Sequence, residues 1–378
     1  TGSASWTTTV KTSTFTAVAG EGYFINTTGG VISVNLPAGT AGDVVAFKDY
    51  AGTFDTNAVT LVQNGSDKIG GSTDNKLLST EGIAATLIFI DSTQGWLVTD
   101  DGLQSTASPP PYSVDFLVIA GGGSGGRLGG GGGGGAGGYR NSYSSESSGG
   151  GGSSEASLTF TPSIVYTITV GAGGAAQSSP GTGNVGIDSS ISGTGITTIT
   201  SAGGGYGGAV SGSTAGVGGN GGSGGGGGIT SALGTTGTSS GTANQGFGGG
   251  SASTDGATYD SGGGGGGASA VGTNGTSDVN VGNGGNGLAS SITASAVTRA
   301  GGGGGRSSSG AGTGGSGGGG AGSGGGIAGT VNTGSGGGGV SGGSSGAGGS
   351  GVVILRMPTV SYSGTVTGAE TPIVDGSD

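Results

Sequence analysis

Long runs of glycine are the feature that most limits what this chain can fold into. Glycine accounts for 108 of the 378 residues, and nearly all of it follows residue 120. A glycine has no side chain to bury and loses more backbone freedom on folding than any other residue. Only 8% of the residues are charged and 5% are aromatic. An ordered fold of these runs therefore has to be held by something other than a large side-chain core.

One ordered state open to polyglycine is the polyproline-II helix, with three residues per turn and a rise of about 3.1 Å per residue. Packed side by side, such helices can satisfy their N–H and C=O groups by bonding to one another. This requires glycine at inward positions and tolerates Ser, Ala, Thr and Asn at outward ones. The runs are 121–138, 203–208, 216–228, 246–250, 262–267, 301–305 and, with interruptions, 310–350.

Two other states of glycine-rich sequence compete with this interpretation. Collagen requires a strict Gly-X-Y repeat with abundant proline, whereas this chain has 8 prolines and no such repeat. A flexible Gly/Ser linker is the second alternative. Strands with apolar residues interrupt the runs, which linkers lack, so we favour a folded bundle.

Residues 1–102 have the pattern of an ordinary β-domain. Short β-branched and aromatic runs alternate with turn residues, and these runs are 31–36, 44–47, 59–62 and 85–90. We predict a small antiparallel β-domain with Trp96 at the edge of its core. Three consecutive prolines, Pro109–Pro111, favour an extended linker over residues 103–111.

Residues 112–357 are predicted to form the glycine-rich domain. Segments 114–120 and 352–356 are its most apolar parts, and pairing them would clasp a bundle of glycine helices into one domain. The predicted fold class is therefore all-β plus polyglycine II, and residues 358–378 are expected to begin a further β-element or a tail. Other strands are expected at 158–160 and 165–170 as a hairpin, 187–191 and 196–200 as a second pair, and 296–300.

The residue types present exclude several kinds of site. The chain has no Cys and no His, which excludes disulfides, Cys/His zinc sites and Ser–His or Cys–His catalytic pairs. A glycosidase needs two carboxylates close together, but the acids of the glycine-rich region stand isolated in sequence. A single Gly183-to-Asp188 segment is a weak match to a calcium β-roll repeat. We therefore expect no enzyme, no cofactor and no metal.

The net charge of −11 also limits the partners. Nucleic-acid binding requires clustered Lys and Arg, whereas the nine basic residues here are scattered. No apolar run approaches the roughly 20 residues of a membrane span, and no basic-plus-apolar leader opens the chain. Because the sequence starts at Thr1 and stops in Gly-Ser-Asp, we expect a processed product or a fragment.

An ordered series of motifs over about 112–357 resembles the glycine-rich domain of bacteriophage tail fibres and adhesins. The motifs are Val-Asp-Phe-Leu-Val-Ile-Ala-Gly-Gly-Gly (114–123), Gly-Ala-Gly-Gly-Tyr-Arg (135–140), Tyr-Thr-Ile-Thr-Val-Gly-Ala-Gly-Gly (166–174), Gly-Asn-Gly-Gly-Asn-Gly-Leu-Ala-Ser-Ser-Ile (282–292) and Gly-Val-Val-Ile-Leu-Arg (351–356). The segment from Gly-Tyr-Phe-Ile-Asn-Thr-Thr-Gly-Gly (22–30) to Gly-Trp-Leu-Val (95–98) similarly resembles a β-domain of phage fibre proteins.

The resemblance implies a structural or adhesive virion fibre protein, located outside cells on a tail or capsid fibre. The implied partners are a host cell-surface receptor (a glycan or an outer-membrane protein), other fibre or tail proteins, and copies of the chain in a homotrimer. Neither nucleic acid nor membrane insertion is expected. The alternatives are a passive extracellular filament or surface-coat protein without a specific ligand, and an ice-binding protein, which would need a flat Thr or Ala array.

Aromatic and basic side chains return near the ends of the glycine runs, where helices must reverse. They either cap the bundle or form a contact surface at loop tips, since Tyr and Arg are favoured contact residues. We expect Tyr139 and Arg140 to be structural caps, and Tyr206, Phe247 and Tyr259 to be receptor contacts. The expected receptor-binding loops are 206–217, 229–245, 251–261 and 268–283.

Overall fold

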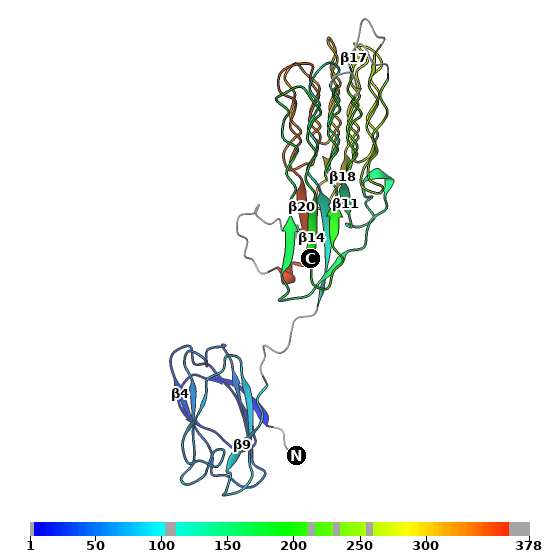
Figure 1. Cartoon of the computed structure of the whole chain (residues 1–378). Coiled ribbons are helices and arrows are strands. Elements are labelled where there is room, and N and C mark those ends of the chain that lie inside the picture. Colours follow the sequence, from blue (N-terminus) through cyan, green and yellow to red (C-terminus); the bar gives the residue numbers. More distant parts are fainter. Residues whose placement is uncertain (1–3, 103–110, 211–215, 230–234, 255–259, 363–378) are drawn as a thin grey trace. The chain divides into compact units, whose positions relative to one another are not determined.

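The computed structural model describes residues 4–102, 111–210, 216–229, 235–254 and 260–362 (Figure 1). The chain divides into two compact units, Thr1–Pro109 and Pro110–Asp378. The described residues form strands, turns and extended backbone, with short 3-10 turns at Gly149–Gly151 and Thr359–Ser361. The fold is therefore all-β. No helix in this described part has the length and apolar character needed to cross a membrane.

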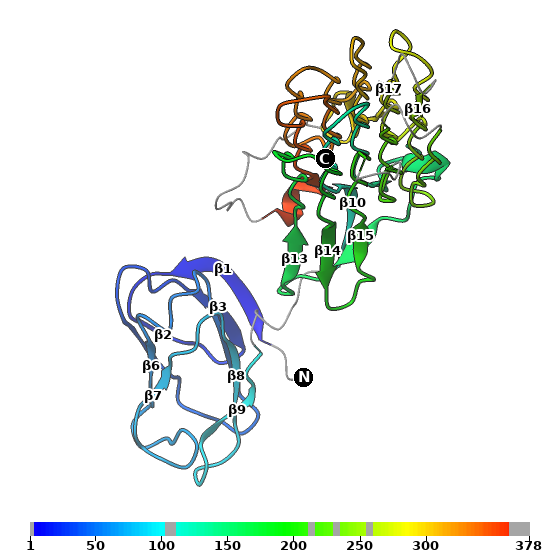
Figure 2. The same cartoon turned by 45° about the horizontal axis from the view of Figure 1, so that its top comes forward.

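The strands of the first unit form two sheets (Figure 2). The larger sheet has the order β1 (Ser5–Lys11), β3 (Glu21–Ile25), β5 (Val44–Asp49), β8 (Ala84–Phe89) and β9 (Trp96–Asp100). The smaller has the order β2 (Phe15–Thr16), β4 (Ile32–Asn35), β6 (Val59–Val62) and β7 (Lys76–Leu78). The four runs expected as strands all lie on strands.

The predicted antiparallel topology of this unit is wrong. From β1 to β6 the chain alternates between the two sheets, so the neighbours β1–β3, β3–β5, β2–β4 and β4–β6 run parallel. Only β5–β8, β8–β9 and β6–β7 are antiparallel. A turn residue reverses the chain equally well toward the opposite sheet or back alongside the same strand. The spacing of turns therefore predicts the strands but not how they pair.

Apolar side chains fill the space between these two sheets. Phe47, Leu87 and Trp96 are 1%, 0% and 0% exposed, which places Trp96 inside the core and not at its edge. Gly95 beside it has a φ of +72°, and a Cβ there would lie 1.8 Å from the carbonyl oxygen of Lys68. Glycine is therefore required for the turn that carries Trp96 inward.

Most strands of the second unit gather at one end, whereas β17 (Asp260–Ser261) lies at the other (Figure 1). The central strand β10 (Tyr112–Ile119) pairs with β11 (Tyr139–Asn141), β12 (Leu158–Phe160) and β20 (Val352–Arg356). The pairing with β20 is antiparallel, with Asp115 opposite Arg356 and Ile119 opposite Val352. The first and last apolar strands of the region therefore lie side by side, as their composition predicted.

Strands lie at the expected positions 187–191, 196–200 and 296–300, whereas β16 (Ser253–Thr254), β17 and β18 (Leu288–Ser290) were not predicted. Strand β14 (Ser189–Gly193) pairs with β15 (Ile199–Ser201), and β18 pairs with β19 (Val297–Arg299). A further two-stranded pair joins β16 to β17.

The hairpin predicted from 158–160 and 165–170 is wrong. Strand β12 pairs with β10, whereas β13 (Tyr166–Thr169) pairs with β14. Strand β12 pairs with β10 because Leu158 and Phe160 pack with Val114 and Phe116 in one buried apolar cluster. Residues 103–110 and 363–378, where a linker and a further β-element were expected, lie outside the described residues.

Between these strands the glycine-rich segments run side by side toward the end of the unit marked by β17 (Figure 1). We call these segments arms. The arms used below are 120–127, 130–138, 202–209, 216–222, 222–229, 246–252, 262–268, 270–276, 281–287, 300–306, 310–316 and 334–340. The run 121–138, expected as one arm, reverses at 127–130 and forms two, since Gly123 donates to Gly135 and Gly126 to Gly132.

Hydrogen bonds join the arms with a period of three residues. In arm 130–138, successive N–H groups donate to three different neighbouring arms in turn, so every third residue reaches the same neighbour. The donor–acceptor pairs are Gly132–Gly208, Gly135–Gly205 and Gly138–Ala202 for one neighbour, Gly133–Gly263 and Ala136–Gly266 for the second, and Gly134–Gly337 and Gly137–Gly334 for the third, at 2.8–3.0 Å. Each residue therefore rotates its N–H by about a third of a turn.

At many of their glycines the arms approach too closely for a side chain to lie between them. A Cβ at Gly133 would lie 2.1 Å from the carbonyl oxygen of Gly303, and one at Gly134 would lie 2.1 Å from that of Gly123. Contacts this short are not possible for a real side chain. The interior of the bundle of arms therefore consists mainly of main chain, whose polar groups are satisfied by neighbouring main chain.

Candidate functional site

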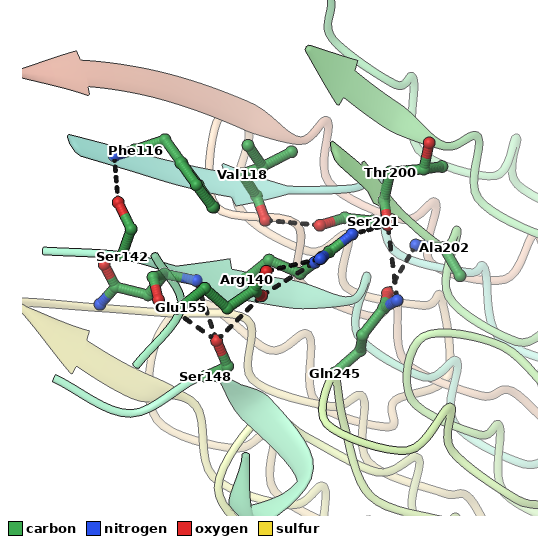
Figure 3. A network of polar contacts seen from close by, with 11 residues as sticks. Phe116, Val118, Arg140, Ser142, Ser148, Glu155, Thr200, Ser201, Ala202 and Gln245 are labelled. Carbon is green, nitrogen blue, oxygen red and sulfur yellow. Dashed lines mark hydrogen bonds and ion pairs between the residues drawn. The ribbon is translucent and has the colours of Figure 1, made fainter. Parts of the chain in front are cut away.

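A network of polar contacts joins the arms to the sheet (Figure 3). Arg140 on β11 forms a two-point ion pair with Glu155: Nε donates to Oε1 at 2.9 Å, and Nη2 lies 2.5 Å from Oε2. Its Nη1 also donates to the carbonyl oxygen of Thr200 at 3.1 Å. Both side chains of the pair are 23% exposed. Arg140 thereby ties β11 both to the segment before β12 and to β15.

Hydroxyl and amide side chains complete this network. Ser142 Oγ accepts the N–H of Phe116 at 2.8 Å, and Ser201 Oγ donates to the carbonyl oxygen of Val118 at 2.7 Å. Gln245 Oε1 accepts the N–H of Ala202 at 2.8 Å, while its own carbonyl oxygen accepts the N–H of Tyr139. The strand end of the bundle is therefore a rigid polar junction.

Tyr139 is fully buried where arm 130–138 enters β11. It packs in an apolar cluster with Leu117, Ile119 and Ile292. Burial raises the pKa of the Tyr139 hydroxyl well above its usual value, and the Glu146 carboxylate raises it further. Burial works against ionisation of Glu146 too, but hydrogen bonds from neighbouring serines and Asn141 lower its pKa overall. Tyr139 and Arg140 follow directly on arm 130–138, and their role as structural caps stays a prediction.

Two of the three predicted receptor contacts, Tyr206 and Phe247, lie in the described residues. Tyr206 lies within arm 202–209 and not at its end, and its ring covers Gly219, where a Cβ would lie 2.6 Å from the ring. Phe247 is half-buried and lies two residues from Gln245 at the strand end. Tyr259 lies outside the described residues. Gly219 lies outside the glycine run that contains Tyr206, so that run by itself does not predict the contact between them. The role of Tyr206, Phe247 and Tyr259 in receptor contact stays a prediction.

At the opposite end of the bundle, larger side chains return where the arms reverse. The Arg127 guanidinium donates to the carbonyl oxygen of Gly343, and Asp278 accepts hydrogen bonds from Ser308 and Ser309. Leu128 is 38% exposed and has a φ of 117°, a conformation that costs free energy for a residue with a side chain. This end therefore carries the exposed Leu128 and the charged side chains of Arg127 and Asp278. Asp278 lies in the predicted loop 268–283, and interruption of the glycine run marks Arg127 and Leu128.

Serine and threonine side chains hold neighbouring arms in register. At Ser124 the N–H donates to the carbonyl oxygen of Asn184 at 2.9 Å, and the N–H of Asn184 donates back to Ser124 Oγ at 2.7 Å. We call this arrangement a clamp, because one residue holds both main-chain groups of another. The same clamp joins Thr236 to Ala252, Thr273 to Asn283 and Ser345 to Gln177.

Asn-Gly pairs form a second kind of clamp. Asn283 Oδ1 accepts the N–H of Thr313 at 2.8 Å, while Gly284 donates its N–H to the carbonyl oxygen of Thr313 at 2.8 Å. Asn-Gly ordinarily indicates a turn, and here it indicates contact between arms. The same arrangement joins Asn220-Gly221 to Ser240, Asn274-Gly275 to Ser251 and Asn286-Gly287 to Ser316.

No group of three or more His, Cys, Asp and Glu side chains in the described ranges is placed to hold a metal ion. The acids described above are engaged in structural contacts: Glu155 with Arg140, Glu146 with Asn141, and Asp278 with two serines. What the arrangement offers is a rigid scaffold with exposed polar side chains.

Comparison with known proteins accounts for both units. A family model described as a glycine-rich domain matches residues 99–358. A second, described as the N-terminal part of bacteriophage T4 gp9/10-like protein, matches residues 1–102. A stretch of 62 residues is 44% identical to the baseplate wedge protein gp10 of Enterobacteria phage T4, covering 16% of this chain and 10% of that protein. The two family models thereby confirm the resemblances inferred from the motifs. The aligned stretch covers about a tenth of the length of the T4 baseplate wedge protein.

Proposed function

This chain belongs to the glycine-rich domain family, and we propose that it is a structural protein of a bacteriophage tail that takes part in attachment to the host cell. One observation carries this proposal: a T4 gp9/10-like N-terminal part and a glycine-rich domain occur in one chain. Identity with a baseplate wedge protein over part of the sequence supports the tail over the capsid. The protein would then be a virion component.

The arms are, in this proposal, polyglycine-II helices clasped by β10 and β20. Support comes from the period of three in their hydrogen bonds, which equals the three residues per turn of that helix. The main-chain contacts at Gly133 and Gly134 supply the close packing that such helices require. The antiparallel pairing of β10 with β20 supplies the clasp.

Each part of the chain has a role in this proposal. Residues 1–102 attach to other tail proteins, 103–111 are the linker, and 112–357 form a rigid spacer. Residues 358–378 form a tail or the start of a further β-element. The host receptor, a glycan or an outer-membrane protein, would contact the loops 206–217, 229–245, 251–261 and 268–283, together with the side chains of Tyr206, Phe247 and Tyr259. We also propose, from the resemblance to fibre proteins, that three copies assemble. Catalysis has no part in the proposed function.

Immunogold electron microscopy of phage particles, with antibodies raised against the purified chain, tests the assignment to the tail. Label confined to the tail or baseplate is the expected result. Label on the capsid, or on fibres of uninfected cells, would overturn it. Antibodies against residues 4–102 and against residues 112–357, used separately, should label positions of different distance from the tail axis.

A further inference from the structure

The chain contains five Asn-Gly pairs, and the structure holds four of them differently from the fifth. The four lie on the arms, and the fifth lies in the first unit; they are Asn220-Gly221, Asn274-Gly275, Asn283-Gly284, Asn286-Gly287 and Asn64-Gly65. All five asparagine side chains are exposed. Exposure to water therefore does not distinguish the five pairs, and a difference in their reactivity has to come from their hydrogen bonds.

An Asn-Gly pair can react with itself. The glycine nitrogen attacks Cγ of the asparagine, so a bond from nitrogen to Cγ forms, the bond from Cγ to Nδ2 breaks, and ammonia leaves with the proton of the glycine N–H. Water then opens the cyclic imide at either carbonyl and leaves aspartate or isoaspartate. Glycine hinders this attack least, because it has no side chain. The reaction requires a glycine N–H that can lose its proton and a carboxamide that can turn toward it.

On the arms, hydrogen bonds occupy the two groups that would have to react. Gly284 donates its N–H to the carbonyl oxygen of Thr313 at 2.8 Å, and Asn283 Oδ1 accepts the N–H of Thr313 at 2.8 Å. The N–H groups of Gly275 and Gly287 are held in the same way, at 2.9 Å and 2.8 Å. Because a carbonyl oxygen of the neighbouring arm holds the proton that must leave, the clamp has to open before the imide can form.

The fourth clamp on the arms is the weakest. Gly221 donates its N–H to the carbonyl oxygen of Ser240 at 3.4 Å, which is long for a hydrogen bond. Asn220 Oδ1 still accepts the N–H of Ser240 at 2.8 Å. This pair therefore has one firm contact where the other three have firm contacts at the glycine.

Asn64-Gly65 lies in a turn after β6 and has no clamp. In the described part of the chain the N–H of Gly65 has no hydrogen-bond acceptor, and the Asn64 side chain makes one long contact. That contact runs from Nδ2 to the carbonyl oxygen of Leu36 at 3.5 Å. Residues 64–66 are all exposed, and Gly65 has a φ of +55°. Imide formation here requires no firm hydrogen bond to break.

We propose that Asn64 is the modification site of the folded chain, converted to aspartate and isoaspartate with water as the co-reactant, and that the clamps protect the Asn-Gly pairs of the arms. Either product adds a negative charge to a turn that already holds Asp67. Isoaspartate also lengthens the main chain before Asp67, whose Oδ2 accepts the N–H of Gly39 at 2.9 Å. The conversion therefore loosens the link between the segments that follow β6 and β4.

The test compares the native full chain with the same chain unfolded in guanidinium chloride, both kept at mildly alkaline pH. Peptic digestion in acid and mass spectrometry then measure conversion at each Asn-Gly pair. In the native chain Asn64 should convert at least about tenfold faster than Asn283, because opening a clamp breaks two hydrogen bonds. Asn220 should convert at an intermediate rate. In the unfolded chain all five pairs should convert at similar rates, because the reacting dipeptide is the same.

Two variants supply matched controls. Asn64→Ser removes the reacting carboxamide and keeps the main-chain hydrogen bond from Asp67 to residue 64, whereas Asn283→Ser removes a protected carboxamide. On ageing, the native chain and Asn283→Ser should gain a more acidic band in isoelectric focusing, and Asn64→Ser should not. Hydrogen exchange at the Gly39 amide should quicken in the aged native chain alone of the native and Asn64→Ser pair. Thermal unfolding should show that both variants are folded.

Three outcomes would overturn the proposal. The first is conversion at an arm pair as fast as at Asn64 in the native chain. The second is the same order of rates in the unfolded chain, because the fold would then not be the cause. The third is an acidic band that appears in Asn64→Ser as quickly as in the native chain. Unchanged exchange at Gly39 after conversion would overturn the loosening of the turn.

Discussion

In the first unit the buried interior consists of side chains, whereas the interior of the bundle of arms in the second consists mainly of main chain. Phe47, Leu87 and Trp96 fill the space between two sheets in the first unit. In the second, the carbonyl oxygen of Gly303 lies where a Cβ of Gly133 would have to be. The first interior is held mainly by the removal of apolar surface from water. The bundle of arms is held by hydrogen bonds between arms, such as those that arm 130–138 donates at 2.8–3.0 Å.

The difference determines what each interior tolerates. A side-chain core accepts a swap of similar volume at modest cost, because neighbouring side chains can repack. A main-chain interior has no side chains to repack, so the smallest addition displaces a whole arm. The comparison therefore predicts that single methyl groups matter more in the second unit than large truncations do in the first.

The largest effect is expected from Gly303→Ala in the interior of the bundle. Its Cβ would lie 2.1 Å from the carbonyl oxygen of Gly337, so the arms must separate and several hydrogen bonds are lost. We expect a loss of about 4–5 kcal/mol in the free energy of unfolding, or failure to fold. The control Gly324→Ala, with no atom within 4 Å of its Cβ, should unfold like the native chain. Equal melting of both variants in calorimetry would contradict a main-chain interior.

Phe47→Ala should have a slightly smaller effect, confined to the first unit. Phe47 is 1% exposed, and truncation of a buried phenylalanine costs about 3–4 kcal/mol. Phe47→Leu should cost about 1.5 kcal/mol or less, because neighbours can repack. Calorimetry of the full chain should show one transition lowered and the other unchanged. A shift of both transitions would mean that the two units unfold together.

Thr236→Val tests a single clamp. The variant keeps the shape of the side chain but removes Oγ1, which accepts the N–H of Ala252 at 2.8 Å. Because Thr236 is 6% exposed, that N–H loses its acceptor in a buried place, at a cost of about 1–3 kcal/mol. The exposed Thr238 offers a matched control, and Thr238→Val should change stability by about 0.5 kcal/mol or less. Hydrogen exchange at the Ala252 amide should quicken only in the first variant.

The smallest effect appears only in alkali. Burial raises the pKa of Tyr23 to about 12, and that of Tyr139 is raised as well. An unfolded tyrosine ionises near pH 10, so above that pH the unfolded state loses a proton that the folded state keeps. Both units should therefore become less stable from about pH 10 upward. Circular dichroism melts between pH 8 and 11.5 should show this loss, and Tyr139→Phe should weaken it in the glycine-rich unit alone.

Composition and local sequence pattern were sufficient to predict that residues 1–102 form a β-domain and that residues 112–357 form an ordered glycine-rich domain. Gly runs broken by apolar strands predicted an ordered bundle, and the apolar character of 114–120 and 352–356 predicted the pairing of β10 with β20. These features follow from the sequence because they depend on what each segment can bury or bond by itself. The motifs within 112–357 were likewise sufficient to identify the family.

For the other segments, only the tertiary structure decided which are neighbours. The parallel pairs of the first unit, the pairing of β12 with β10, and the place of Tyr206 within an arm depend on contacts between residues far apart in sequence. The reason is that a turn residue or a glycine permits many directions of the chain, and burial of distant partners selects one. Asn283 illustrates this: the sequence shows an Asn-Gly pair, but the fold alone makes it a clamp on Thr313.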